Sequence, residues 1–217
     1  RRSKLLFLNY PNNPTGAVIE PGDTFFADVV EFARANDIVV VHDNAYSEIS
    51  FDGYRAPSFL ATPGAMDVGV EMFSLSKAWN MTGWRVGACV GNPDVVSAFW
   101  KLKTNIDSGM FDAIQLASAT ALTECASFPE EMSVIYQRRR DLVIDALRAI
   151  GLEPNAPKGS IYVWARVPDG QSETAALQQQ LQKAVAEASM ARLAREVAHD
   201  FAQYLQVIQI TTNLDAA

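Results

Sequence analysis

The sequence predicts an α/β fold with a mostly parallel sheet flanked by helices. Two short runs of apolar residues, at positions 5–10 and 38–42, have the length of strands. Continuous apolar runs of this kind are typical of strands that are buried on both faces. Residues 23–36, between the two runs, carry apolar side chains at helical spacing. A helix between two buried strands indicates a parallel strand–helix–strand unit.

The remaining elements follow this unit along the chain. The turn-forming sequence PNNPTG comes directly after the first strand. A helix over residues 92–105 is expected because Asn92-Pro93-Asp94 supplies a cap, a proline for the first turn and an acid near the helix dipole. The other expected elements are strands at 68–75, 84–91 and 160–167 and helices at 111–124 and 129–150, the last of which ends before Gly151.

Composition and charge limit the classes of function. Hydrophobic residues make up 49% of the 217 residues, which is enough to bury a sizeable core. The formal net charge of −7 disfavours nucleic acids and anionic membranes as partners. No signal peptide or membrane span is recognisable, which predicts a cytoplasmic protein. Cys89 and Cys125 lack the spacing of a metal site, so no metal is expected.

Three polar segments each follow a predicted strand, at residues 12–16, 43–46 and 74–85. In an open α/β sheet, ligands bind outside the carboxyl ends of the strands. We therefore expect the three segments to line one site.

The residues of the third segment suggest a cofactor. Taken alone, Lys77 could be an ordinary solvated lysine. A desolvated lysine near another cation is instead a good nucleophile towards carbonyls, because its free amine is populated, and Arg85 supplies such a charge. Arg85 also suits a phosphate, together with the hydroxyls of Ser74 and Ser76. A lysine nucleophile beside a phosphate site indicates pyridoxal 5′-phosphate (PLP).

The other two segments fit the same cofactor. The Asp43 carboxylate at a strand end needs a partner, and the protonated pyridine nitrogen of PLP is a suitable one. Tyr46 and Asn13 offer hydrogen-bond donors for the phenolate oxygen of the ring. Taken singly, residues 43–46 could be a helix cap and PNNPTG a simple turn, so the prediction depends on their occurring together. His42 is expected to be structural rather than a catalytic base.

The motifs NNPTG, HDNAYSEI and SLSKAWNMTGWRVG, in this order and spacing, resemble the fold-type I, PLP-dependent aminotransferases of class I/II. The sequences HDNAYSEISFDGYRAPSF, NIDSGMF and IYQRRRDL look most like the LL-diaminopimelate aminotransferase-like branch. The resemblance covers residues 4–167 without a break, and its motifs are highly specific together.

The resemblance implies a role for each site residue. Lys77 would form the internal aldimine and then carry the proton between Cα and C4′. Family enzymes are homodimers with sites at the subunit interface, and residues 105–111 look like part of that shared region. Lys158-Gly159-Ser160 resembles a loop that faces the substrate. The implied PLP contacts are Asp43 to the pyridine nitrogen, Asn13 and Tyr46 to the phenolate oxygen, and Ser74, Ser76 and Arg85 to the phosphate.

The chain also departs from the family pattern, and we expect it to be a fragment. It begins without Met and runs directly into a strand, and nothing precedes Arg1 to supply the family's N-terminal phosphate-binding turn and stacking aromatic residue. The family's carboxylate-binding arginine is also missing, because the last arginine is Arg195. Residues 199–205 resemble a helix that the family places soon after VPDG. The expected division is therefore residues 1–128 as part of the PLP-binding large domain, and residues 129–217 as a connecting helix and an incomplete small α/β domain with a helical insertion at about 171–198.

The predicted function is transfer of an amino group between an amino acid and a 2-oxo acid. One alternative is a catalytically incompetent fragment, or an interaction remnant whose long Ala/Gln-rich helix at residues 171–205 binds a partner. The other is a PLP-dependent β-lyase, since the same fold and site chemistry serve both reactions. The charged run at residues 138–140 is expected to be solvated or ion-paired.

Overall fold

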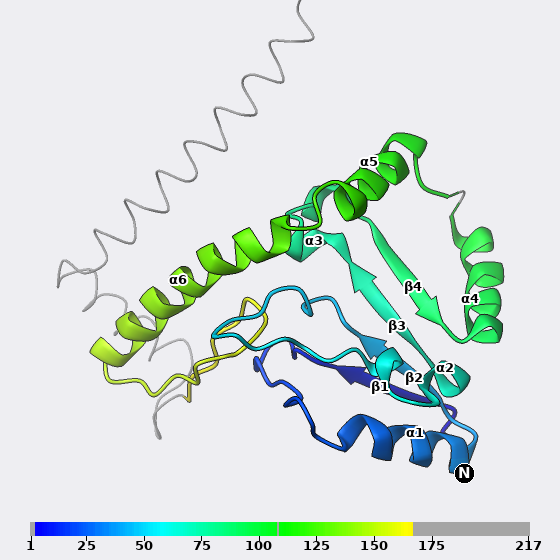
Figure 1. Ribbon diagram of the computed structural model, residues 1–217, viewed down its shortest axis with the longest axis horizontal. Helices are drawn as coiled ribbons and strands as arrows, with labels where there is room; N and C mark the ends of the chain where they lie inside the picture. Colours follow the sequence, from blue (N-terminus) through cyan, green and yellow to red (C-terminus); the bar gives the residue numbers. More distant parts are fainter. Residues whose placement is uncertain (1–2, 108, 167–217) are drawn as a thin grey trace, which may run out of the picture. The chain divides into compact units, whose positions relative to one another are not determined.

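The structure is a computed structural model that describes residues 3–107 and 109–166. The described residues contain a four-stranded sheet, with the strands in the order β1-β2-β3-β4 (Figure 1). The strands are β1 (Leu5–Asn9), β2 (Val39–Asp43), β3 (Gly69–Ser74) and β4 (Gly87–Gly91). The helices are α1 (Phe25–Asn36), η1 (Phe59–Ala61), α2 (Ala65–Val68), α3 (Leu75–Ala78), η2 (Thr82–Trp84), α4 (Pro93–Ile106), α5 (Asp112–Thr123) and α6 (Phe128–Ala149).

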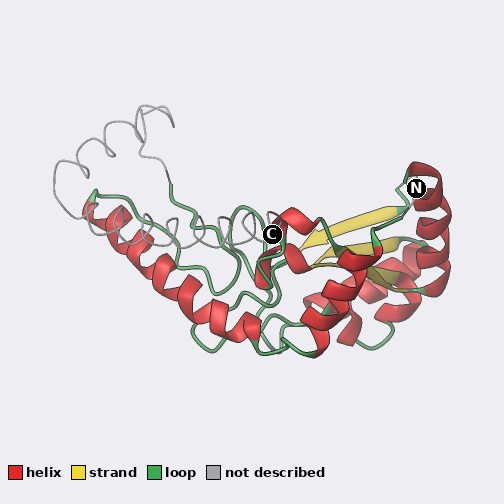
Figure 2. Ribbon diagram, turned by 90° about the horizontal axis from the view of Figure 1, so that it is seen from above, coloured by secondary structure: helices red, strands yellow, loops and turns green. Residues whose placement is uncertain are grey.

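The sheet is mostly parallel, as the sequence predicts. Strands β1, β2 and β3 run in the same direction, and β4 is antiparallel to β3. The strands lie next to one another among the helices (Figure 2), and β3 passes directly into α3. Because the first three strands are parallel, their carboxyl ends lie at one edge of the sheet.

Helix α1 covers one face of the sheet through its buried apolar stripe. Phe26, Val30 and Ala33 share a helical face and are buried against Val40 of β2 and the ring of Phe59. This spacing of three and four residues is the pattern from which the helix was predicted. Helix α4 also begins where its cap predicts.

The Asn92 cap shows why the helix start was predictable. Its side-chain oxygen accepts hydrogen bonds from the backbone N–H groups of Asp94 and Val95, at 3.0 and 3.1 Å. These two N–H groups have no partner within the helix, so the cap satisfies donors that would otherwise be unpaired.

The expectation that the first strand is buried on both faces is wrong. Leu8 is only 8% exposed, but Leu5 and Phe7 on the alternate positions are 66% and 64% exposed. A continuous apolar run shows that both faces are apolar. It does not show that both faces are covered, which depends on what packs against an edge strand such as β1.

The expected strand at residues 160–167 is also wrong for its described part. Ser160 has a positive φ of 72°, which interrupts an extended backbone. The Tyr162 N–H is bonded to the Ser160 hydroxyl at 3.3 Å instead of to a neighbouring strand. Ala165 forms only an isolated bridge, to Pro154.

The chain divides into two compact units, Arg1–Arg140 with Ala156–Trp164, and Asp141–Asn155 with Ala165–Ala217. In the second unit the N–H of Gly151 donates to the Arg148 carbonyl at 2.9 Å after the end of α6. The division expected at residue 128 stays a prediction, as do the insertion at about 171–198 and the helix at 199–205, which lie outside the described residues. The site described next belongs entirely to the first unit.

Candidate active site

The three predicted polar segments meet at one edge of the sheet. Asn9 at the end of β1 is paired with Asp43 at the end of β2, and Asp43 is paired with Met72, two residues before the end of β3. Ser74, the last residue of β3, is opposite Gly87, the first residue of the antiparallel strand β4. The segment just before β4, which carries Arg85, therefore arrives at the same edge.

Asn9 fixes the turn that carries Asn13. Its side-chain nitrogen donates to the Asp43 carbonyl at 2.9 Å, and its side-chain oxygen accepts the N–H of Asn13 at 2.7 Å. One side chain thus joins the end of β2 to the turn after β1. The Asn12 side chain adds a second brace, since its oxygen accepts the hydroxyl of Thr15 at 2.7 Å.

Tyr46 lies at the centre of the site and is only 4% exposed. Its hydroxyl is 3.0 Å from the hydroxyl of Tyr162, and the two rings meet edge to face. Burial raises the pKa of the Tyr46 phenol, and so do the Tyr162 hydroxyl and the negative charge of Asp43, whereas a hydrogen bond with Asn13 opposes this rise. Asn13 and Asp43 therefore both act on the Tyr46 phenol.

Lys77 lies above the Tyr46 ring, with its amine 5.9 Å from the ring centroid. It is half-buried on the short helix α3, whose first turn is capped by Ser74. Within residues 3–107 and 109–166, the Lys77 amine makes no hydrogen bond or ion pair with another residue. In the same part of the chain the half-buried Asp43 carboxylate makes none either.

The three residues predicted to hold phosphate cluster around the α3–η2 turn. The Ser74 hydroxyl accepts the N–H of Ser76 at 3.2 Å, and Ser76 itself is 7% exposed. The Ser76 carbonyl accepts the Thr82 hydroxyl at 2.7 Å. Arg85 is exposed and its guanidinium donates to the Thr82 carbonyl at 3.1 Å. These bonds hold the two serines and the arginine on one small turn.

His42 is fully buried, in agreement with the expected structural role. Its Nδ1 lies 2.9 Å from a Glu71 carboxylate oxygen, and its Nε2 lies 3.1 Å from the Tyr10 carbonyl oxygen. Burial alone raises the pKa of Glu71, but the bonds and charge from His42, with hydrogen bonds from Ser58 and Phe59, outweigh it and lower the pKa below its usual value.

The sequence did not single out two residues of the site. Asn9 is the last residue of β1, and Tyr162 follows the Lys158-Gly159-Ser160 segment by two positions. A signal existed for Tyr162, because a segment resembling a substrate-facing loop is followed closely by an aromatic residue with a hydroxyl. Its contact with Tyr46 was not predictable, since the two residues are 116 positions apart.

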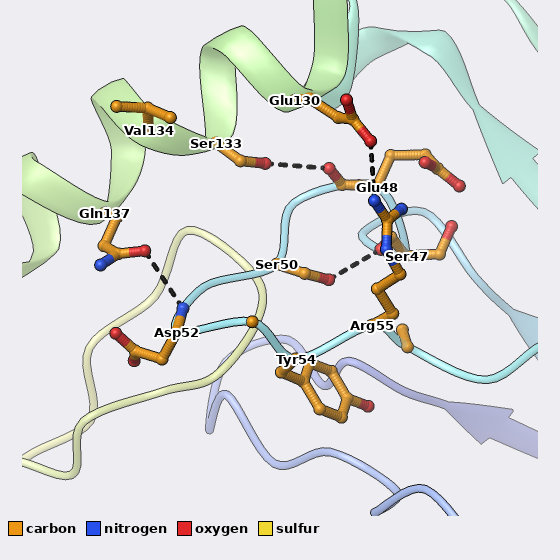
Figure 3. Close-up of a pocket in the computed structure, with 12 residues that line it drawn as sticks. Ser47, Glu48, Ser50, Asp52, Tyr54, Arg55, Glu130, Ser133, Val134 and Gln137 are labelled. Carbon is orange, nitrogen blue, oxygen red and sulfur yellow. Dashed lines mark hydrogen bonds and ion pairs between the residues drawn. The ribbon is translucent and has the colours of Figure 1, made fainter. Parts of the chain in front are cut away.

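A separate pocket of about 420 Å³ lies between the loop after Tyr46 and the first turns of α6 (Figure 3). Arg55 reaches across it to Glu130 at 2.7 Å, and Gln137 accepts the N–H of Asp52 at 3.1 Å. None of the residues predicted to bind PLP lines this pocket. Its polar groups are largely bonded to one another, so we assign it no ligand.

Comparison with known proteins places the chain in a family. The sequence model of "Aminotransferase class I and II" matches residues 1–199, so the chain belongs to the class I and II aminotransferases. This family is PLP-dependent in general. The match confirms the resemblance to the fold-type I aminotransferases of class I/II.

Particular relatives agree with the predicted branch. The chain is 50% identical over 184 residues to LL-diaminopimelate aminotransferase from Moorella thermoacetica, which covers 85% of this chain and 47% of the relative. It is 49% identical over 174 residues to the enzyme of the same name from Halothermothrix orenii. This match covers 80% of this chain and 44% of the relative. The chain thus spans about half the length of the curated relatives it matches.

A solved structure supports the fold. An aminotransferase from Staphylococcus aureus superposes with a TM-score of 0.74 at 39% identity, over 81% of this chain and 46% of that one.

Among the described helices, none has both the length and the apolar character needed to cross a membrane.

Proposed function

We propose that this chain carries the cofactor-binding part of an aminotransferase, with PLP attached to Lys77, and that the complete protein transfers an amino group between an amino acid and a 2-oxo acid. One observation carries the proposal. Lys77 and Asp43 lie at the same sheet edge, both half-buried, and within the described residues neither side chain has a hydrogen bond or ion pair. A charged group that is partly withdrawn from water gains from a hydrogen-bonding or ionic partner, so a ligand that supplies such partners fits this site.

The side chains match the chemical groups of PLP one by one. The Lys77 amine suits the aldehyde, and the Asp43 carboxylate suits the protonated pyridine nitrogen. The Asn13 and Tyr46 side chains, which already interact with each other, suit the phenolate oxygen. The phosphate would be bound by Arg85 and by the hydroxyls of Ser74 and Ser76.

In the proposed reaction, each residue has a task defined by its position. Bound PLP supplies a ring that accepts the electron pair left when a bond to the substrate Cα breaks. Asp43 keeps the proton on the pyridine nitrogen by its negative charge. The Lys77 amine accepts the proton from Cα and later returns one, which is general base and then general acid catalysis. Tyr46, buried and held by Tyr162, keeps its hydroxyl hydrogen and can donate it.

The amino-group donor is proposed from the relatives. Two curated relatives at 49–50% identity are named LL-diaminopimelate aminotransferase, so LL-diaminopimelate is the first donor to test. The proposal also includes a homodimer for the complete protein and a cytoplasmic location. Light scattering of the complete protein tests the first of these.

A titration with PLP tests the proposal on this chain. Visible absorbance of bound cofactor should saturate in the wild-type protein and be lost in Lys77→Ala. Lys4→Ala is a matched control, because Lys4 is an exposed lysine just before β1, at the opposite end of that strand from the site, paired with Asp37 at 2.6 Å, and the variant should bind PLP normally. Equal binding by both variants would contradict the assignment of Lys77.

Turnover distinguishes the reaction from its alternatives. With LL-diaminopimelate and a 2-oxo acid, the complete protein should produce the amino-acid product of the 2-oxo acid. Release of ammonia and pyruvate from an amino acid would indicate a β-lyase instead. Normal PLP binding without any turnover of the complete protein would indicate an incompetent remnant.

A further inference from the structure

We propose that His42 and Glu71 are positioning residues for the cofactor site, which they serve by fixing the turn that carries Asn13. The inference rests on the proposed function only for its effect on PLP. The effect on the turn itself can be measured without cofactor. Neither side chain is among the residues predicted to touch PLP.

The His42–Glu71 pair is buried, and the donor and the acceptor of each of its polar contacts can be assigned. His42 is 0% exposed and Glu71 is 7% exposed. Both ring nitrogens of His42 face acceptor oxygens, namely the Glu71 carboxylate at 2.9 Å and the Tyr10 carbonyl at 3.1 Å. A carbonyl and a carboxylate accept only, so the arrangement is satisfied by an imidazolium that donates to both.

The far side of the carboxylate is satisfied as well. Glu71 accepts the Phe59 N–H at 2.6 Å and the Ser58 hydroxyl at 2.9 Å. These two donors favour the ionised form of the Glu71 carboxylate. The Phe26 and Phe59 rings pack against the imidazole in edge-to-face arrangements, with centroids 5.2 and 6.3 Å away.

A contribution to stability does not by itself explain why this pair is buried. Desolvation of two charges offsets much of their attraction, and apolar side chains of similar volume often fill such a site at no loss of stability. An apolar pair, however, could not hold the Tyr10 carbonyl in one direction. The geometric consequence of the pair is that the backbone at Tyr10 is fixed to β2 and β3.

Tyr10 is the residue where the turn leaves β1. His42 holds its carbonyl, and three positions later the N–H of Asn13 is bonded to the Asn9 side chain at 2.7 Å. Within the same turn the Asn12 N–H donates to the Ala17 carbonyl at 2.8 Å. The bond from His42 to the Tyr10 carbonyl and the bond between Asn9 and Asn13 together fix the position of Asn13 relative to Asp43. Asp43 follows His42 directly on β2.

Two variants distinguish a positioning role of the His42–Glu71 pair from a general contribution to core packing. His42→Asn keeps an amide near the Nδ1 position, facing Glu71, and loses the bond to Tyr10. Glu71→Gln keeps the side-chain volume and removes the charge. Ser58→Ala is the matched control, because it removes a hydrogen bond from the same carboxylate on the side away from the turn.

The first measurement is amide hydrogen exchange of the full chain without cofactor. We expect exchange at residues 12–17 to accelerate about tenfold in His42→Asn and Glu71→Gln, in line with the loss of one hydrogen bond involving a charged group. Exchange in α1 serves as the internal reference, and we expect it to stay within about twofold of wild type, as should all segments in Ser58→Ala. Equal acceleration of α1 would mean a merely structural role and would overturn the inference.

The second measurement is the apparent dissociation constant for PLP under the same conditions. It should rise about tenfold in the two pair variants and stay within about twofold in Ser58→Ala. Unchanged affinity in a variant whose turn exchanges faster would also overturn the inference. If His42→Asn does not fold, Glu71→Gln decides both arms. If the wild-type chain binds no PLP, the proposed function fails, and the exchange of residues 12–17 still decides whether the pair positions the turn.

Discussion

Replacing Arg140 with methionine should destabilise the first unit far more than its place in a charged run on α6 suggests. The Arg140 side chain is 8% exposed and its guanidinium bonds both oxygens of Asp52, at 2.6 and 3.1 Å. It also donates to the Pro157 carbonyl at 2.9 Å and lies 4.9 Å from the Phe51 ring centroid. One side chain thus joins α6, the loop after Tyr46 and the loop that carries Tyr162.

The magnitude follows from these contacts. Hydrogen bonds that involve a charged group contribute about 1.5–3 kcal/mol, and breaking a fully buried pair costs about 3–5 kcal/mol. Asp52 is 51% exposed, so water compensates part of its loss. Methionine keeps the contact with Phe51. We therefore expect Arg140→Met to lower the free energy of unfolding by about 2–3 kcal/mol.

Urea unfolding at pH 7 and at lower pH checks both size and cause. The Arg140 hydrogen bond lowers the pKa of Asp52 against the opposing effect of burial. A carboxyl group whose pKa is lowered by folding stabilises the folded state at pH values above its pKa in the unfolded chain, about 3.9. This contribution is lost as the pH falls through the pKa of the folded state. The difference between wild type and Arg140→Met should therefore shrink below about pH 4.

Arg55→Met is the control for this prediction. Arg55 forms an ion pair of similar length with Glu130, at 2.7 Å, but the two side chains are 80% and 66% exposed. Exposed pairs of this kind contribute little. Equal losses of stability in the two variants, or a difference that does not change with pH, would refute the reasoning about Arg140.

Two further substitutions test the packing of the first unit by thermal unfolding. Tyr54→Phe removes the donor to the Ile19 carbonyl at 2.8 Å, so we expect a loss of about 1 kcal/mol; an unchanged melting temperature would mean that water replaces this bond. Gly69→Ala would place a Cβ 2.7 Å from the Val40 carbonyl oxygen, and the resulting overpacking should cost about 1–3 kcal/mol. Gly83→Ala meets nothing within 4 Å and should be nearly neutral, so similar losses at both glycines would contradict the steric argument.

The convergence of the site was predictable from the sequence because it depends on local signals. Apolar runs predicted the strands, and Asp43 and Ser74 stand at the ends of two of them. In a parallel sheet those ends share an edge, so no knowledge of distant contacts was needed. The roles of these residues towards PLP remain predictions, because they concern a ligand rather than the fold.

The rest of the site depends on contacts that no local pattern carries. Tyr162 meets Tyr46 across 116 positions, and Arg140 meets Asp52 across 88. The strand expected from residue 160 fails for a similar reason, because Ser160 adopts its positive φ where its N–H bonds the Ile49 carbonyl. Tertiary contacts thus decided the backbone conformation there.

The central claim is that Lys77 is the covalent attachment point for PLP. Reduction of the PLP-loaded chain with borohydride, followed by proteolysis and mass spectrometry, locates the attachment directly. We predict a pyridoxyl group on the peptide that contains Lys77, and its loss in Lys77→Ala. A pyridoxyl group spread over exposed lysines such as Lys101 and Lys158, with the Lys77 peptide unmodified, would contradict the account.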